Sequence, residues 1–287
     1  MTTEAFIATM ARETRVAGGT APRALRGEAI PEQSWQLDGT RFLLRATGEH
    51  YFLYAKGSGI IVERGAGADL SEESLWLNGS IYSAIAAING LMPMHASAVA
   101  HDGQVYAFTG PSGAGKSTIA AALSRRSMPM FCDDTLVLDL SDPQRIMCLP
   151  GHKRLKLTEQ ALALTGAAKQ EKVCATIDKY YAQPAGGSSD GPLPLAALIF
   201  LSDGPDMAIT PVRGGASVAR LHDDHYTAAL FLQARRFDRP GYFAHLAGLA
   251  ARIPLADFVR PRDTGLFEQG VDLAAQYISG CRPGRRI

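Results

Sequence analysis

A short glycine-rich segment limits the folds open to this chain more than any other part of its sequence. Residues 110–118 read GPSGAGKST and satisfy the phosphate-loop pattern of Gly, any four residues, then Gly-Lys-Ser. The apolar run QVYAFT precedes this segment and the helix-forming run IAAALSRR follows it, which is the strand, loop and helix order that the pattern requires. Apolar strands and helices keep alternating beyond it, so the sequence predicts an α/β fold.

Each residue type in this segment suits the binding of phosphate. Glycines let backbone N–H groups turn toward phosphate oxygens, because a Cβ atom would obstruct such a loop. Lys116 would neutralise the β- and γ-phosphates, and the Ser117 hydroxyl would bind Mg²⁺. An ordinary glycine-rich turn is the alternative interpretation. The predicted cofactors are ATP and Mg²⁺, and the predicted ATP-binding residues are Gly110, Ser112, Gly113, Ala114, Gly115, Lys116, Ser117 and Thr118.

Acidic residues after two apolar segments help to separate the classes of phosphate-loop protein. Asp133 and Asp134 follow the segment MPMFC, and Asp203 follows LIFLS. A transporter ATPase would use the later acid and would also need an LSGGQ-type signature, which the sequence lacks. A switch GTPase would need DxxG and NKxD motifs, and no convincing NKxD is found. Kinase chemistry is therefore the favoured interpretation.

The adjacent carboxylates of Asp133 and Asp134 can divide the work of a kinase. One can hold Mg²⁺ while the other accepts the proton of the attacking hydroxyl. A helix cap or a turn with solvated acids is the alternative for this pair. His95 stands at the start of HASAVA, the apolar segment that precedes QVYAFT. A lone histidine beside apolar residues is more often a packed core residue than a catalyst.

Composition and charge argue against several partners and compartments. The 29 basic and 28 acidic residues leave a net charge of +1, which gives no global attraction to nucleic acid or to an anionic membrane. The four cysteines are far apart, and the N-terminal segment lacks the apolar core of a secretory signal. The sequence therefore predicts a cytoplasmic protein with no nucleic-acid and no membrane partner, and it leaves a homo-oligomer open.

The chain divides into two predicted regions. Residues 34–63 alternate strand-forming runs with turn residues, and residues 71–89 carry apolar groups at helical spacing. Residues 1–90 are therefore predicted as a small β-rich N-terminal subdomain with a linking helix. Residues 91–287 are predicted as the P-loop catalytic domain, with further strands and amphipathic helices beyond the acidic pair.

Three motifs together resemble the HPr kinase/phosphorylase family: HASAV at 95–99, GPSGAGKST at 110–118 and CDD at 132–134. The resemblance implies the P-loop fold variant shared with phosphoenolpyruvate carboxykinases, and the ATP-dependent phosphorylation of a serine hydroxyl on a protein or peptide. It also implies a catalytic set of Asp133 as base, Asp134 beside Mg²⁺ with Ser117, His95 as partner of the acidic pair, and Lys116.

Two departures narrow this resemblance. Thr118 follows the loop serine where HPr kinases usually have glutamate, and their later glycine-rich signature loop is not found. The strand-rich N-terminal part, the HASAV strand and the segment PGHKRLKL look closer to the HPr-kinase-like proteins of lasso peptide biosynthesis. That similarity implies a precursor peptide that is phosphorylated on its C-terminal residue. A kinase for a small metabolite and a nucleotide-binding regulator with slow hydrolysis are the alternatives.

Basic residues beyond the acidic pair are the candidates for contacts with substrate. The PGHKRLKL segment carries Lys153, Arg154 and Lys156, and Arg154 is the preferred contact for phosphate or an acidic peptide terminus. Lys179 precedes a glycine-rich loop, which suits a lid over the nucleotide. Solvated basic edges are the alternative for these lysines and arginines. The sequence HDDH at 222–225 is explained more simply by a helix cap than by a metal site.

Overall fold

The computed structural model describes residues 2–222 and 225–281, which form two compact units. The first unit comprises the described parts of Met1–Met94 and Asp224–Asp238, and the second those of His95–Asp223 and Arg239–Ile287. The chain thus returns to the first unit for one late helix, which the predicted division at residue 90 did not include. Within the described residues, no helix has both the length and the apolar character that a membrane crossing would need.

The first unit contains a five-stranded sheet in the order β1-β5-β4-β3-β2. Neighbouring strands from β2 to β5 are antiparallel and follow one another in sequence, whereas β1 pairs with β5 in parallel. These are the strands predicted between residues 34 and 63, with β1 added at one edge. The strands of this unit are β1 (Val16–Gly18), β2 (Ser34–Asp38), β3 (Arg41–Arg45), β4 (His50–Ala55), β5 (Gly59–Arg64) and the short β6 (Met92–Met94).

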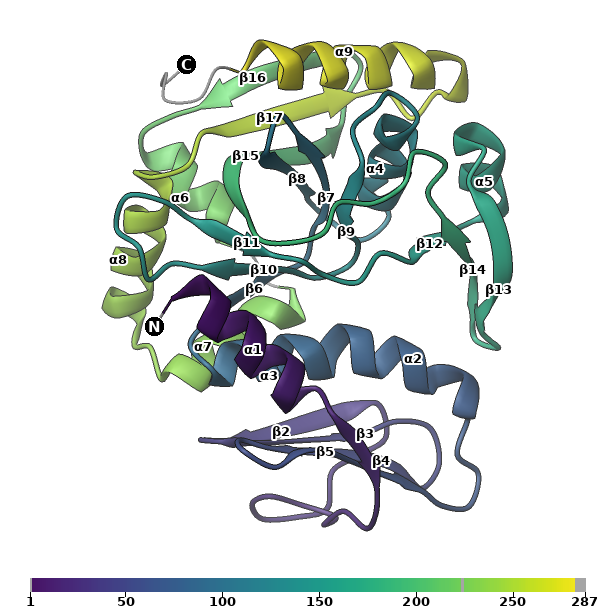
Figure 1. Ribbon diagram of the computed structural model, residues 1–287, viewed down its shortest axis with the longest axis vertical. Helices are drawn as coiled ribbons and strands as arrows, with labels where there is room; N and C mark the ends of the chain where they lie inside the picture. Colours follow the sequence, from purple (N-terminus) through teal and green to yellow (C-terminus); the bar gives the residue numbers. More distant parts are fainter. Residues whose placement is uncertain (1, 223–224, 282–287) are drawn as a thin grey trace. The chain divides into compact units, whose positions relative to one another are not determined.

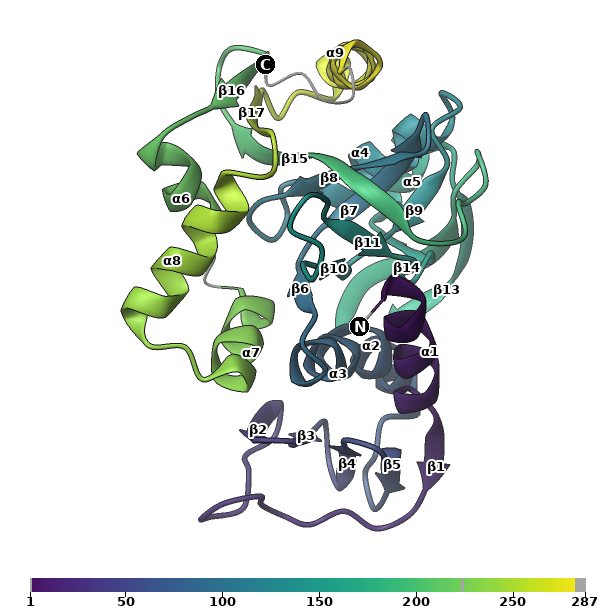
Figure 2. The ribbon, with the colours of Figure 1, turned by 60° about the vertical axis from the view of Figure 1, so that its left-hand side comes forward.

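Helices α2 and α3 cover one face of this sheet (Figure 1, Figure 2). Buried polar bonds join the elements, since the Tyr54 hydroxyl in β4 donates to Oε2 of Glu13 in α1 over 2.9 Å. Asn89, which follows α3, donates from Nδ2 to the same Tyr54 hydroxyl over 2.8 Å. Tyr54 therefore links three elements of the unit. Its helices are α1 (Thr3–Glu13), η1 (Leu70–Glu72), α2 (Glu73–Trp76), η2 (Leu77–Ile81), α3 (Tyr82–Ile88) and α7 (Tyr226–Arg235).

Strand β15 is central to the second unit. Its first residues pair antiparallel with β11, and its later residues pair in parallel with β8 on one side and β17 on the other. Strands β7 and β9 extend the sheet beyond β8, β16 extends it beyond β17, and β10 pairs with β11. Parallel strands end at the same edge of a sheet, so the residues that follow β8, β15 and β17 come together there. The strands are β7 (Ser97–His101), β8 (Gln104–Thr109), β9 (Met130–Cys132), β10 (Leu136–Asp139), β11 (Met147–Leu149), β15 (Leu193–Asp203), β16 (Ala208–Val212) and β17 (Leu255–Arg260).

Helices α4 (Lys116–Ser124) and α9 (Phe267–Gly280) pack on this sheet. The core between them contains alternate residues of the strands and residues at helical spacing from α9, as the two periodicities predict. This packing fixes the start of α4 against the end of β8, where the phosphate loop lies. The fully or nearly fully buried members include Val99, Tyr106, Phe108, Ile119, Leu123, Ala197, Ile199, Leu201, Phe258, Val271, Ala274 and Ile278.

A three-stranded antiparallel sheet in the order β12-β14-β13 shares a core with α4. Leu155 and Leu157 of β12 are buried in that core, so Lys156 between them faces the opposite side of the strand. This alternation decides where the Lys156 side chain points. The elements are β12 (Leu155–Leu157), α5 (Glu159–Thr165), β13 (Ala168–Cys174) and β14 (Ile177–Gln183).

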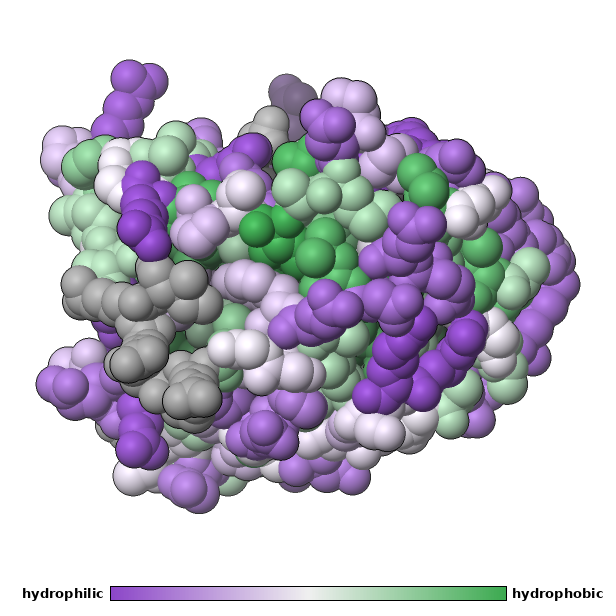
Figure 3. Space-filling view, turned by 90° about the horizontal axis from the view of Figure 1, so that it is seen from above, coloured by the Kyte–Doolittle hydropathy of each residue, from purple (hydrophilic) through white to green (hydrophobic). Residues whose placement is uncertain are grey.

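The remaining helices of the second unit are α6 (Gly215–Leu221), α8 (Arg239–Ala250) and the short η3 (Thr264–Leu266). Helix α8 was predicted from its apolar spacing, whereas α6 and the strand β17 were not. At the end of the unit where Figure 1 shows α9 and β16, the view from above has an apolar patch bordered by hydrophilic residues (Figure 3).

Candidate nucleotide-binding and active site

The predicted phosphate loop lies between the end of β8 at Thr109 and the start of α4 at Lys116. Gly110 has φ = 135°, and a Cβ atom there would lie 2.6 Å from the carbonyl oxygen of Leu201 in β15. Gly115 has φ = 84° at the N-cap of α4. Both positions therefore need glycine, because side chains disfavour such φ values and Leu201 leaves no room at the first. The result is a tight turn that directs the first N–H groups of α4 into the loop.

The Lys116 side chain folds back onto the loop that it follows. Its Nζ donates hydrogen bonds to the carbonyl oxygens of Gly110, over 2.8 Å, and Pro111, over 3.0 Å. The side chain is buried, with 6% of the residue exposed. An ammonium group prefers an anionic acceptor to neutral carbonyls, so a phosphate group entering the loop offers Lys116 a stronger partner.

Asp133 lies beside the loop serine. Its Oδ1 accepts hydrogen bonds from the hydroxyls of Ser117, over 2.8 Å, and Ser97, over 2.6 Å. Its Oδ2 accepts from the backbone N–H of Lys156 over 3.2 Å. Only 1% of Asp133 is exposed. A carboxylate that is this buried and this well hydrogen-bonded is held in one position next to the loop.

Asp134 has different partners from its neighbour. Its φ of 71° is in the left-handed region, which turns its side chain away from that of Asp133. Its Oδ2 lies 2.7 Å from Nζ of Lys156, and its Oδ1 lies 3.7 Å from Nδ1 of His95. The same His95 nitrogen lies 2.9 Å from the Asp134 backbone oxygen. Asp134 remains about a fifth exposed (21%), so its carboxylate is the more accessible of the two.

Lys156 carries a positive charge beside the acidic pair. Burial opposes the charged form of Lys156, but the carboxylates of Asp134 and Asp133 outweigh it and raise the lysine pKa above its usual value. Nearby His152 has a lowered pKa, chiefly because of burial and then because of the Lys156 charge. Its imidazole is therefore neutral at pH 7. Lys156 therefore stays charged, with its ammonium on Asp134 and with Asp133 also favouring the charged form.

Two of the three substrate candidates, Lys153 and Arg154, pair with acids other than Asp133 and Asp134. Lys153 pairs with Asp190, and Arg154 pairs with Glu171 while its guanidinium stacks 3.9 Å from the Tyr181 ring centre. Lys179 lies on β14, partly exposed. The choice of Arg154 stays a prediction, and the cation that contacts the acidic pair in the structure is Lys156. Asp223 and Asp224 of the HDDH sequence lie outside the described residues.

Asp133 and Asp203 were the two candidates for the acidic residue that assists the phosphate loop, and only Asp133 contacts the loop serine. Asp133 contacts Ser117, whereas Asp203 at the end of β15 pairs with Arg262, with Oδ2 and Nε 2.5 Å apart. Hydroxyl and carboxylate oxygens are ligands that Mg²⁺ prefers, and the loop serine with a strand-end aspartate is a known pair for it. Ser117 and Asp133 therefore fit the ion. Among the described residues no group of three or more His, Cys, Asp or Glu could hold a metal without other ligands.

Sequence reasoning missed Arg260, the last residue of β17. Its guanidinium donates to the backbone oxygen of Ala114, and a Cβ atom on Gly115 would lie 2.8 Å from its Nη2. Burial lowers its pKa, with Asp203 opposing and Arg262 adding to the shift. Among the described carboxylates none forms an ion pair with it. Arg260 thus adds a positive charge next to the loop, with Asp203 as the acidic group that acts on it.

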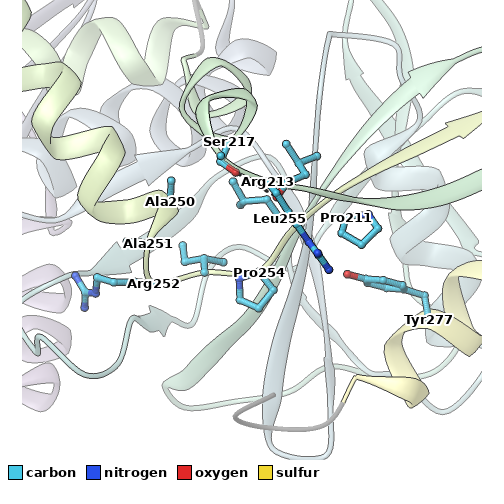
Figure 4. Close-up of a pocket in the computed structure, with 12 residues that line it drawn as sticks. Pro211, Arg213, Ser217, Ala250, Ala251, Arg252, Pro254, Leu255 and Tyr277 are labelled. Carbon is cyan, nitrogen blue, oxygen red and sulfur yellow. Dashed lines mark hydrogen bonds between the residues drawn. The ribbon is translucent and has the colours of Figure 1, made fainter. Parts of the chain in front are cut away.

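Cavities lie at both ends of β17. One of about 480 Å³ lies near its first residue, Leu255, where the Arg213 guanidinium and the Tyr277 hydroxyl point toward one another (Figure 4). Another of about 250 Å³ is lined by Arg260 and by residues 113–115 of the loop. Ligands of parallel α/β sheets bind at the carboxyl ends of the strands, which is the end of the second cavity. The first cavity lies at the amino end of β17, whereas the phosphate loop lies near the carboxyl end.

Two of three comparisons with known proteins gave a match. Residues 94–188, a third of the chain, match the family described as ABC transporter, and this span contains the loop and the acidic pair. Among solved structures, the HPr(Ser) kinase/phosphatase from Coxiella burnetii aligns with 13% sequence identity and a TM-score of 0.33 over 66% of this chain and 99% of that chain. The search of curated proteins gives no match. With its strand, loop and helix in place, the chain is a mixed α/β protein with a nucleotide-binding P-loop.

Proposed function

We propose that this chain is an ATP- and Mg²⁺-dependent kinase that phosphorylates a serine hydroxyl of a peptide or protein. The observation that carries the proposal is the separation of partners in the acidic pair, with Asp133 on the loop serine and Asp134 on Lys156. Nucleotide hydrolysis needs only the first arrangement. A second, accessible carboxylate beside a cation suits the activation of a hydroxyl acceptor. The similarity to lasso peptide kinases in HASAV and PGHKRLKL makes the C-terminal residue of a precursor peptide the first acceptor to test.

The division of roles within the pair is the reverse of the one drawn from the sequence. There, Asp133 was the base and Asp134 the Mg²⁺ ligand. The geometry supports Asp133 as the Mg²⁺ ligand, because its Oδ1 accepts the hydrogen bond of Ser117, whose hydroxyl is the other proposed ligand. It supports Asp134 as the base, because a base must reach the hydroxyl and Asp134 is the more exposed of the two.

The transfer follows from these positions. Backbone N–H groups of the loop and the Lys116 ammonium bind the phosphates, and Ser117 and Asp133 would hold a Mg²⁺ ion that would supply further positive charge to them. The acceptor oxygen forms a bond to the γ-phosphorus as the bond to the β,γ-bridging oxygen breaks, and ADP leaves. Asp134 takes the proton of the acceptor hydroxyl. Lys156 keeps its charge and pairs with Oδ2 of Asp134, which holds the Asp134 carboxylate in place.

The test is intact-mass spectrometry of a serine-terminated precursor peptide after incubation with the protein, ATP and Mg²⁺. One added phosphate on the peptide, and none on a peptide that lacks the terminal serine, is the expected result. Asp134→Asn should abolish transfer and keep ATP binding, whereas Asp133→Asn should lose the Mg²⁺ dependence of ATP binding. Asp142→Asn, in the loop after β10, is the matched control. Phosphate on a small hydroxyl compound but on no peptide would identify a metabolite kinase instead.

A nucleotide-binding regulator with slow hydrolysis is the second candidate, and the family match over residues 94–188 favours it. Such a protein would turn over ATP at a rate that no acceptor changes. The missing LSGGQ-type signature counts against the complete hydrolytic machinery of a transporter ATPase. ATP turnover measured with and without peptide separates the two candidates.

A further inference from the structure

The proposed phosphoryl transfer gives no role to the cavity of about 250 Å³ beside the phosphate loop. It touches Ala114, Gly115 and Thr118 of the loop and the first turn of α4. Lys116, Ser117 and the acidic pair are not among its lining residues. The cavity therefore reaches the loop from the side away from the groups that hold the terminal phosphate.

We infer that this cavity binds the nucleoside part of the nucleoside triphosphate, its base and ribose. A phosphate loop orders its ligand, because its backbone holds the α- and β-phosphates while its lysine reaches the β- and γ-phosphates. With the γ-phosphate near Lys116 and Asp133, the α-phosphate and the nucleoside lie on the other side of the loop. The cavity is the space that the described residues leave open on that side.

The walls of the cavity have the chemistry that a base and a ribose need. Ile119 of α4, Met207 before β16 and Phe267 at the start of α9 supply apolar surface on which a flat base can pack. Arg262 and Asp263 in the loop after β17 supply a donor and an acceptor at the rim. The volume of about 250 Å³ is just below the roughly 300–1,000 Å³ of small-ligand pockets. It therefore suits a base better than an extended peptide.

Arg260 connects the cavity to the loop. Arg260 and Ala114 both line the cavity, and the Arg260 guanidinium donates to the backbone oxygen of Ala114. An anion at this point would compensate a charge that burial disfavours. The α-phosphate of the nucleotide is the anion that joins the loop to the nucleoside.

Gly270 of α9 offers a direct way to fill the cavity. A Cβ atom there would lie 3.6 Å from Phe258, 3.7 Å from Met207 and 3.9 Å from Arg260, so the position is close to the lining without being crowded at its first carbon. Gly270→Leu would extend into the space of the base. Gly280→Leu is the matched control, because it is the same change in the same helix with nothing within 4 Å.

The experiment compares the binding of ATP with that of inorganic tripolyphosphate, which has the three phosphates and no nucleoside, by calorimetry with Mg²⁺. Gly270→Leu should weaken ATP binding about tenfold or more and leave tripolyphosphate binding within about twofold of the wild type. Gly280→Leu should change neither. Equal losses for both ligands, or unchanged ATP binding, would overturn the inference. Retained tripolyphosphate binding also shows that the variant is folded.

A second measurement needs no substitution. Ultraviolet cross-linking of 8-azido-ATP to the wild-type protein should label the segment 261–270, and ATP should compete with that label far better than tripolyphosphate does. Label that is absent from every segment lining the cavity would refute the inference. The inference rests on the nucleotide binding in the proposed function and not on phosphoryl transfer, so ATP binding and labelling without any transfer would defeat the proposed function alone.

Discussion

Nζ of Lys156 lies 2.7 Å from Oδ2 of Asp134, and the backbone N–H of the same lysine donates to Oδ2 of Asp133 over 3.2 Å. One residue of β12 therefore fastens both members of the acidic pair, through two different groups. A substitution removes only the side-chain contact, which makes the two roles separable.

Lys156→Met should leave Asp134 without its ammonium partner while the backbone bond to Asp133 remains. We expect the rate of transfer in a single turnover to fall at least about tenfold, because the base loses its fixed position and the site loses a positive charge. ATP affinity should change by less than about threefold. Lys169→Met, at an exposed ion pair with Glu159, is the control. Equal losses of transfer and ATP affinity would contradict the separation of roles.

The two hydroxyls on Asp133 should respond differently to removal. Ser117→Ala should abolish the increase in ATP affinity that Mg²⁺ causes, since it deletes a proposed ligand. Ser97→Ala should keep that increase but lower the free energy of unfolding by about 1–3 kcal/mol, because a buried carboxylate loses a hydrogen bond. Calorimetry at two Mg²⁺ concentrations and urea unfolding measure the two effects. Loss of Mg²⁺ dependence in Ser97→Ala alone would reverse the assignment.

Tyr54→Phe should destabilise the first unit. The change removes one hydroxyl that donates to buried Glu13 and accepts from Asn89, so the expected loss is about 1–3 kcal/mol in urea unfolding. Tyr181→Phe is a suitable control, because the Tyr181 hydroxyl is buried and has no hydrogen-bond partner among the described residues. Equal effects of the two substitutions would show that the network around Tyr54 contributes nothing of its own.

The stability of the first unit should fall below pH 6.5 because of His50. This side chain is fully buried, and burial lowers its pKa below the ordinary 6.5 despite the opposing charge of Glu73. The unfolded chain then binds the proton first, so the free energy of unfolding falls as pH falls through that window. Glu63 and Glu73 have pKa values that are lowered from 4.5, chiefly by hydrogen bonds to arginines. They therefore reduce the free energy of unfolding only as the pH falls below 4.5.

Urea unfolding at pH values from 5 to 7.5 checks this dependence. His50→Phe should show a smaller slope of unfolding free energy against pH in the upper part of that range than the wild type. Parallel slopes for the two proteins would assign the acid sensitivity to other groups.

The phosphate loop and its nearest acid were predictable because their signals are local. Sixteen residues separate Ser117 from Asp133, and one helix and one short strand span that distance, so the contact follows from the succession of elements. The assignment of roles that we propose within the pair has no such local signal. It depends on the left-handed backbone of Asp134 and on burial, and neither is written in two adjacent aspartates.

The contacts of the site that sequence reasoning missed join residues of distant strands. The alternation Leu-Lys-Leu at 155–157 marks Lys156 as facing away from the core, yet nothing local shows that Asp134 lies there. Arg260 ends a strand that pairs with β15, and the pairing partner of a strand is decided by the whole sheet. Its contact with Ala114 joins residues that are 146 positions apart. Such contacts cannot be derived from periodicity.

The position of β15 has a consequence for how the site is lost. This strand pairs with β8, which leads into the phosphate loop, with β11, which precedes the Lys156 segment, and with β17, which ends at Arg260. Opening of β15 would disconnect all three at once. Backbone amides along it should therefore exchange their hydrogens only through the largest opening of the second unit, and the site should disappear in one cooperative step.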